Sequence, residues 1–337
     1  MILRKALIAA AALALTAAWT TAGAYELGYP GWAQKPGVTL WGSVTAATPP
    51  PGLYMNNVFL TYQATIVGPG AVGLSHAGPP GTNNPPTQLH VASEASSLLW
   101  VPGWTFLGAT YDAVIIQPFI MSDLSAPINI NPAGVHNTFI IPFELGWNLG
   151  HSGFFVKTGL GIYVPDGTIT GPTGLGSIGN PWWTYEPELL ISYLKDGWNF
   201  TANLFEEINT QNTYTGYTSG NILHAEFTAT KAIGKWTLGP LAYYAGQVTN
   251  DRSSAFYGNA INVSKYDIWA VGALVGYDFG PVALSVWALD EIYNNASSTT
   301  NPTGGTIPKG YTVFASISYR LWGPDAPAAP KNPLIHK

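Results

Sequence analysis

Apolar and polar side chains alternate along most of the chain in a series of separate runs. In the clearest run, odd-numbered positions from Tyr311 to Leu321 carry apolar or tyrosine side chains, while even-numbered positions from Thr312 to Arg320 are mostly polar. A repeat of two residues is typical of a β-strand with one apolar face. The runs predict strands at 53–67, 89–101, 103–121, 135–149, 153–165, 182–195, 198–210, 218–232, 235–249, 262–278, 281–293 and 310–322.

The connections between these runs are alternately short and long. Five short ones contain Gly, Asp or Pro and lie at 101–104, 149–153, 194–198, 232–236 and 278–281. Six longer polar stretches separate them, at 68–88, 122–134, 166–181, 211–217, 250–261 and 294–309. Bacterial outer-membrane proteins have an even number of strands, short periplasmic turns and long outward loops. We therefore predict an all-β fold, a transmembrane antiparallel β-barrel of the outer-membrane type with about 12 strands.

The composition agrees with an exported membrane protein. Charged residues make up 9% of the chain and aromatic residues 13%, and there is no cysteine. Soluble domains usually contain about 25% charged residues. A secreted soluble β-sandwich would explain the alternation of side chains, but it would explain neither the low charge nor the regular order of short and long connections. The net charge of -5 gives no reason to expect nucleic acid as a partner.

The pattern also predicts how the chain is divided. Residues 1–24 have Arg4 and Lys5, an apolar run and a final Ala-Gly-Ala, which is typical of a secretory signal peptide. An N-terminal membrane anchor is the alternative interpretation. We expect residues 25–52 to form a periplasmic N-terminal segment, 53–322 the barrel, and 323–337 a disordered, Pro-rich periplasmic tail.

Several stretches resemble a known family. They are PPPGLYMNNVFLTY at 49–62, GLGIYVPDGT at 159–168, GLGSIGNPWWTYEPELLISYL at 174–194, FEEINTQNTYTGYTSGNILHAEF at 205–227 and GPLAYYAGQVTND at 239–251. Together they are similar to the MetA/SphA-like outer-membrane family associated with the meta-pathway of phenol degradation, over most of 49–322. The resemblance implies a barrel that helps hydrophobic, often aromatic, compounds through the outer membrane.

The hairpin at 186–207 places acidic residues opposite each other. Asp196-Gly197 is a strong signal for a two-residue hairpin turn, which pairs Lys195 with Trp198. The same register sets Glu186 opposite Glu207 on the inner face. Like charges that face each other are destabilising, so this pair requires a nearby cation, a shared proton or water. Glu206 has the opposite parity, and we expect it to face outward near the outer rim.

Seven residues are candidates for a substrate-binding or lumen-lining site. Parity and neighbouring strands place them on the inner face: Lys157, Glu186, Glu188, Phe205, Glu207, His224 and Glu226. Two interpretations remain open. The cluster is either a solvated or salt-bridged pore lining, or a constriction that binds ligand. Glutamates with a single histidine do not predict a metal site.

The predicted function is passive uptake of small hydrophobic, phenol-type aromatic compounds by a monomer in the bacterial outer membrane. Its partners would be the solute and outer-membrane lipid, without a cofactor or nucleic acid. Loops 68–88 and 166–181 would fold over the outer mouth. One alternative is a general diffusion porin for polar solutes. Another is an interfacial barrel enzyme, although the chain has no G-x-S-x-G, H-E-x-x-H or Walker A motif.

Overall fold

The structure is a computed structural model that describes residues 26, 29–68, 71, 76, 81–172, 174, 176–259, 265–297 and 306–324. The expected signal peptide, and all of the expected C-terminal tail beyond residue 324, lie outside these residues. In the described part of the chain, no helix is both long enough and apolar enough to cross a membrane.

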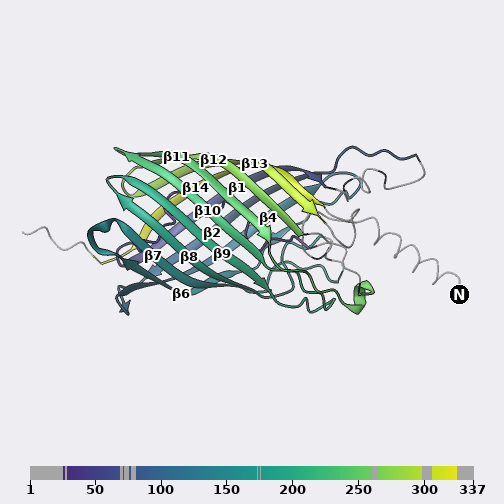
Figure 1. Ribbon diagram of the computed structural model, residues 1–337, viewed down its shortest axis with the longest axis horizontal. Helices are drawn as coiled ribbons and strands as arrows, with labels where there is room; N and C mark the ends of the chain where they lie inside the picture. Colours follow the sequence, from purple (N-terminus) through teal and green to yellow (C-terminus); the bar gives the residue numbers. More distant parts are fainter. Residues whose placement is uncertain are drawn as a thin grey trace, which may run out of the picture.

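The described residues form a closed antiparallel barrel of twelve long strands, as the alternation of side chains predicts (Figure 1). The strands are β1 (Gly52–Val67), β2 (Gln88–Val101), β4 (Ala109–Leu124), β6 (Phe139–Asn148), β7 (Phe154–Tyr163), β8 (Thr184–Lys195), β9 (Trp198–Asn209), β10 (Ile222–Ile233), β11 (Trp236–Gln247), β12 (Lys265–Asp278), β13 (Val282–Ser297) and β14 (Ile307–Trp322). Pairing of β1 with β14 closes the barrel. Short turns lie at one end and longer loops at the other, and we call these the turn end and the loop end.

Two short strands interrupt this regular pattern. β3 (Thr105–Phe106) forms a small hairpin with the start of β4, and β5 (Ala133–Val135) pairs with β4 nearer its other end. Leu107 and Gly108, at the tip of the small hairpin, have φ angles of 50° and 78°. The turn predicted at 101–104 is therefore misplaced, because β2 and β3 are both antiparallel to β4 and the chain reverses at Leu107 and Gly108.

The hairpin of β8 and β9 has the predicted turn and register. Asp196 and Gly197 have φ angles of 52° and 75°, as a type I′ turn requires, and Lys195 lies opposite Trp198. Further along, Glu188 lies opposite Phe205. Glu186 and Glu207 are 3% and 0% exposed, so both are buried inside the barrel. Glu206 has the predicted outward parity, and its side chain accepts a hydrogen bond from Asn221 Nδ2 at 2.9 Å.

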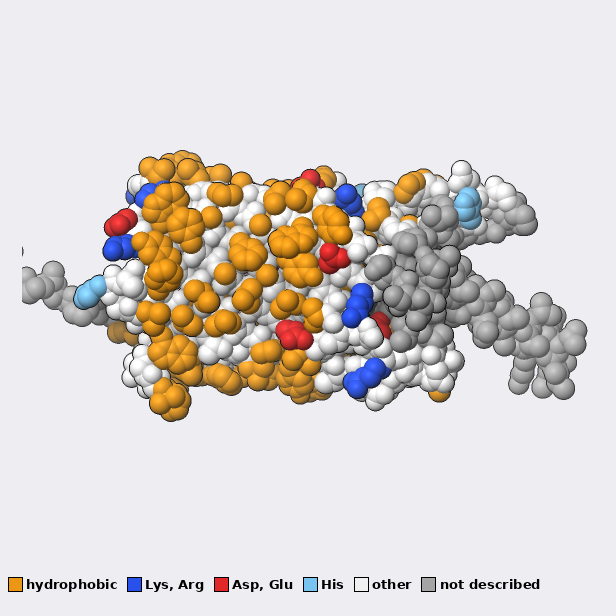
Figure 2. All heavy atoms as spheres, viewed as in Figure 1, with side chains coloured by type: hydrophobic (Ala, Val, Ile, Leu, Met, Phe, Trp, Pro, Cys, Tyr) orange, Lys and Arg blue, Asp and Glu red, His pale blue; other side chains and the backbone are white. Residues whose placement is uncertain are grey.

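The outer face of the barrel is apolar. Figure 2 shows hydrophobic side chains spread over the middle of the wall, with Lys and Arg side chains towards its two ends. Ile115, Phe200, Val271 and Val286 are among the exposed side chains, and Trp198 and Trp236 are exposed near the turn end. An apolar band flanked by aromatic residues is the surface that a transmembrane barrel presents to lipid.

The expected periplasmic position of residues 25–52 differs from the structure, because most of this stretch lies inside the barrel. The N–H of Glu26 donates to Ser219 Oγ at the loop end, while Arg320 donates to the carbonyl of Pro51 at the turn end. Between them, Trp287 Nε1 donates to the carbonyl of Gly37 at 2.9 Å. We call residues 29–48 the internal segment. They show no alternating run that could extend the sheet, and inward polar side chains of the barrel bind their backbone groups.

Candidate functional site

One side of the barrel interior carries buried charged and polar side chains, which we call the polar wall. It consists of Asp112, Glu144, Lys157, Glu186, Glu188, Glu207, His224, Glu226 and Glu291. Glu207 accepts hydrogen bonds from the N–H groups of Ala33 and Gln34, both at 3.1 Å. Glu226 accepts the N–H of Gly37 at 2.5 Å and the hydroxyl of Thr39. The polar wall therefore holds the internal segment through the segment's own backbone.

The two backbone N–H groups of the internal segment offset the charge of Glu207. Besides the two N–H groups, His224 Nε2 lies 3.1 Å from Glu207 Oε1, and the His224 ring stacks on Phe205 with centroids 4.5 Å apart. Lys157, which the sequence suggests as a neighbour of the facing pair, instead lies 2.9 Å from Asp112 Oδ2 and 3.7 Å from Glu144 Oε1. Glu186 keeps one buried carboxyl oxygen without a hydrogen-bond partner among the described residues.

The seven residues predicted from the sequence lie together on β7, β8, β9 and β10. Six of them have no more than 5% of their surface exposed, and Glu188 is partly buried. None is among the residues that border the cavity described below. Two of them, Glu207 and Glu226, hydrogen-bond to the internal segment, and a part for the seven in ligand binding stays a prediction. Among the described residues, no group of three or more His, Asp or Glu side chains could hold a metal ion.

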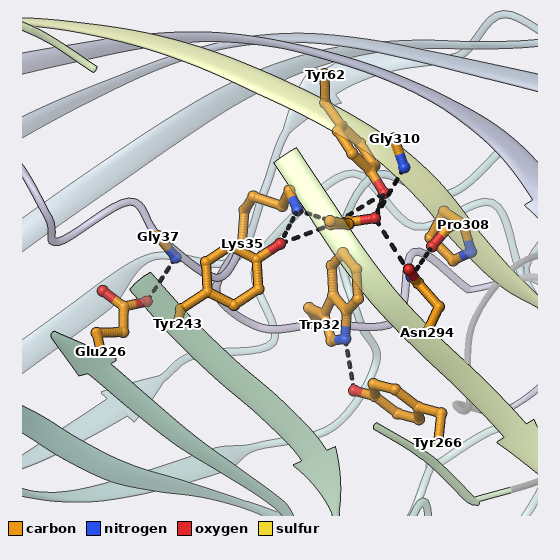
Figure 3. Close-up of polar contacts among 11 residues, drawn as sticks. Trp32, Lys35, Gly37, Tyr62, Glu226, Tyr243, Tyr266, Asn294, Pro308 and Gly310 are labelled. Carbon is orange, nitrogen blue, oxygen red and sulfur yellow. Dashed lines mark hydrogen bonds and ion pairs between the residues drawn. The ribbon is translucent and has the colours of Figure 1, made fainter. Parts of the chain in front are cut away.

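A second cluster fixes the middle of the internal segment (Figure 3). Lys35 Nζ lies 3.0 Å from Glu291 Oε1 and 4.0 Å from the centroid of the Tyr62 ring. The hydroxyls of Tyr62 and Tyr243 and the N–H of Gly310 donate to the same carboxylate at 2.9 Å. The cluster joins the segment to β11 and to the neighbouring strands β13, β14 and β1, where the barrel closes.

A cavity of about 310 Å³ lies between the internal segment and the inner faces of β1, β2 and β4. Apolar residues dominate its lining: Val58 and Leu60 on β1, Leu89, Val91 and Ala95 on β2, Ile116, Pro118 and Ile120 on β4, and Trp32, Val38, Trp41 and Val44 on the segment. We call these apolar residues on β1, β2 and β4 the apolar wall, and the same strands also contribute Asn56, Ser93, Ser97 and Ser122 to the lining. A cavity of about 150 Å³ with such a lining can bind benzene, so this one is large enough for a substituted single ring.

One feature of the sequence indicates the apolar wall, although the assignment of inward and outward faces did not use it. On β4, Val114, Ile115 and Ile116 are consecutive, so the strand is apolar on both faces. On β8, by contrast, apolar side chains face outward while Glu186 and Glu188 face inward. A strand with two apolar faces in a barrel interior indicates a surface that contacts something other than water.

The loop end of the cavity is closed by contacts between loops and the start of the described chain. Tyr29 donates its hydroxyl to the carbonyl of Gly171 at 2.8 Å, so the loop at 166–181 packs on the internal segment. Of the second loop expected there, 68–88, residues 69–70, 72–75 and 77–80 lie outside the described residues. Nearby, Asp251 accepts hydrogen bonds from Tyr217, Gly220 and Gln247 at 2.5–2.7 Å. Burial outweighs these donors and raises the pKa of Asp251 to about 6.

Solved structures with a similar fold are bacterial outer-membrane barrels. The COG4313 outer membrane channel from Pseudomonas putida F1 has a TM-score of 0.62 at 11% sequence identity, over 81% of this chain and 96% of that chain. The β domain of the Bordetella autotransporter BrkA has a TM-score of 0.43 at 12% identity, over 80% and 99%. No curated protein matches the sequence. A family model matches residues 68–300, more than two-thirds of the 337-residue chain, and the chain therefore belongs to the family described as "Putative MetA-pathway of phenol degradation".

Proposed function

We propose that the protein is an outer-membrane channel for the passive uptake of small hydrophobic, aromatic compounds. The observation that carries this proposal is the cavity of about 310 Å³ with its apolar lining inside a closed barrel. An apolar solute gains free energy on leaving water for such a surface, at about 25 cal/mol per Å² of apolar area buried. The apolar wall gives it that surface through the interior, while the internal segment fills the space along the polar wall.

The comparisons support the proposal in two ways. The description of the family refers to phenol degradation, and a pathway of that kind needs its aromatic substrate to cross the outer membrane. The channel from Pseudomonas putida F1 supports the fold of an outer-membrane channel. Passive diffusion through a preformed cavity needs neither a cofactor nor a catalytic residue, and we propose that the protein is not an enzyme.

The arrangement of the interior favours this function over a general porin for polar solutes. A general porin has a wide, water-filled lumen. Here the internal segment runs through the lumen, and buried carboxylates of the polar wall hold it there. The wall of the barrel is closed and apolar on its outside, which agrees with a monomer surrounded by outer-membrane lipid.

Filling the cavity tests the proposal. Ala95 faces the cavity, and an Ala95→Trp variant is expected to lower the uptake of labelled toluene to the rate of cells without the protein. Uptake is measured in whole cells, whose lipopolysaccharide layer is the barrier that a channel must bypass. The control is Ala92→Trp, because Ala92 has the opposite parity on the same strand and faces lipid. Wild-type uptake no faster than in cells without the protein would contradict the proposal.

A further inference from the structure

Three buried nitrogen atoms on residues that border the cavity have no hydrogen-bond partner among the described residues. They are Gln34 Nε2, Trp41 Nε1 and His136 Nδ1. More than about 90% of buried polar groups in proteins are hydrogen-bonded, because an unpaired one loses its bonds to water without replacement. Polar groups left unpaired beside an apolar cavity are therefore candidates for contact with a solute inside it.

The side-chain amide of Gln34 is fixed through its oxygen, and its nitrogen is able to donate a hydrogen bond. Its Oε1 accepts a hydrogen bond from the hydroxyl of Tyr163 at 3.1 Å. The backbone N–H of Gln34 donates to Glu207 Oε1. Both contacts fix the residue, and they leave the side-chain NH₂ group as a donor without an acceptor.

His136 is fixed through its backbone to β4. Its N–H donates to the carbonyl of Pro118 at 2.9 Å, and its carbonyl accepts from Gln117 Nε2 at 2.9 Å. The residue is 3% exposed, and a neutral imidazole has one nitrogen that donates and one that accepts.

Hydrogen bonds of Asn180 connect the chain around Gln34 with the chain around His136. Asn180 Nδ2 donates to the carbonyl of Gly31, and the Asn180 N–H donates to Asn137 Oδ1, so one residue links the chain next to His136 with the chain just before Gln34. The rings of Phe139 and Tyr163 stack nearby with centroids 4.2 Å apart. Gln34, His136, Phe139 and Tyr163 all border the cavity, so the two unpaired nitrogens and two aromatic rings belong to the lining of the same space.

We propose that Gln34 and His136 form a polar subsite that takes the hydroxyl group of a solute whose apolar ring lies in the cavity. A hydroxyl group matches this pair because its oxygen accepts a hydrogen bond from an N–H while its hydrogen is donated to the lone pair of an imidazole nitrogen. A hydrocarbon of the same size leaves both nitrogens unpaired. A carboxylate is disfavoured because Glu207 lies beside Gln34. The inference rests on the proposed function and adds to it a preference for hydroxylated over plain aromatic solutes.

The test compares phenol with toluene, which differ by a hydroxyl against a methyl group. Initial rates of whole-cell uptake are measured against concentration for the wild type, Gln34→Leu and His136→Phe. Each substitution is expected to raise the half-saturating concentration of phenol about two- to tenfold, which is the loss of one net hydrogen bond, and to leave that of toluene unchanged. Gln63→Leu and His90→Phe are matched controls, since both residues are exposed on the barrel's outer face and neither borders the cavity.

The outcomes separate the inference from the proposed function. Unchanged half-saturating concentrations of phenol in both variants, with toluene uptake intact, would overturn the subsite alone. Equal losses of phenol and toluene uptake in both variants would also overturn it, because the residues would then be structural. If only His136→Phe loses uptake of both phenol and toluene, the result with Gln34→Leu decides whether the subsite exists. Gln34 belongs to the internal segment and not to the barrel wall. A wild type that takes up neither compound would refute the proposed function itself.

Discussion

Deleting residues 29–48 is expected to turn the protein into an open, cation-selective pore. The deletion removes the internal segment, whose one acidic or basic side chain in this range is Lys35. It exposes the seven carboxyl side chains of the polar wall, at Asp112, Glu144, Glu186, Glu188, Glu207, Glu226 and Glu291, against one lysine, Lys157. Pores lined by carboxylates attract cations and repel anions. The strands pair through their own backbones, so the barrel itself is expected to form.

Single-channel recording in planar bilayers measures both effects of this deletion. We expect a conductance several-fold above that of the full chain and a reversal potential in a salt gradient that shows cation preference. Adding Glu186→Gln, Glu207→Gln and Glu226→Gln to the deletion is the matched control, and it should reduce the preference without reducing the conductance. A deletion variant that stays closed, or that prefers anions, would show that the segment is not what fills the lumen.

Replacing Lys35 by methionine is expected to loosen the middle of the internal segment. The Lys35 side chain is 14% exposed and that of Glu291 is 1% exposed, so the substitution leaves a buried carboxylate without its cation. Removing one partner of a buried ion pair costs about 3–5 kcal/mol. The lower end applies here, because Tyr62, Tyr243 and Gly310 still donate to Glu291.

Hydrogen exchange of the backbone amides near Gly37 reports this change. A loss of about 3 kcal/mol corresponds to roughly hundredfold faster exchange if the segment opens locally. The double variant Lys35→Met with Glu291→Gln removes the uncompensated charge, and it should recover most of the protection. If exchange in Lys35→Met equals that of the wild type, the ion pair does not hold the segment.

The barrel could be predicted from the sequence because its strands and turns are determined by residues close together in the chain. Alternation along each strand gives the inward face, and turn residues such as Asp196 and Gly197 give the register of a hairpin. For this reason the inward position of Glu186 and the outward position of Glu206 follow from parity alone. The reversal at Leu107 and Gly108 was placed at 101–104 instead, because Pro102 and Gly103 are also typical turn residues.

The interior could not be predicted in the same way, because its contacts join residues far apart in the sequence. Glu207 is bound by the backbone N–H groups of Ala33 and Gln34. Almost every residue type has a backbone N–H, so the sequence does not show which ones bind a side chain. The internal segment has no strand pattern, so the sequence suggested that it lies outside the barrel. The position of the cavity depends on where the internal segment lies inside the barrel. The cavity between the segment and β2 could therefore not be predicted from the sequence.

The central claim is that hydrophobic solutes pass along the apolar wall while the internal segment stays on the polar wall. The chain has no cysteine, so a single disulfide can be introduced cleanly. Thr39→Cys on the segment and Asn203→Cys on β9 replace side chains whose polar atoms are 3.4 Å apart. Formation of the bond is checked by gel mobility with and without reductant.

The most direct measurement is the whole-cell uptake of labelled toluene by this variant in its oxidised and reduced forms. The disulfide ties the segment to the polar wall, away from the apolar side chains of β1, β2 and β4 that line the cavity. We predict equal uptake rates in the two forms. Uptake that stops on oxidation and returns with reductant would contradict the claim, because it would mean that the segment must leave the polar wall before a solute can pass.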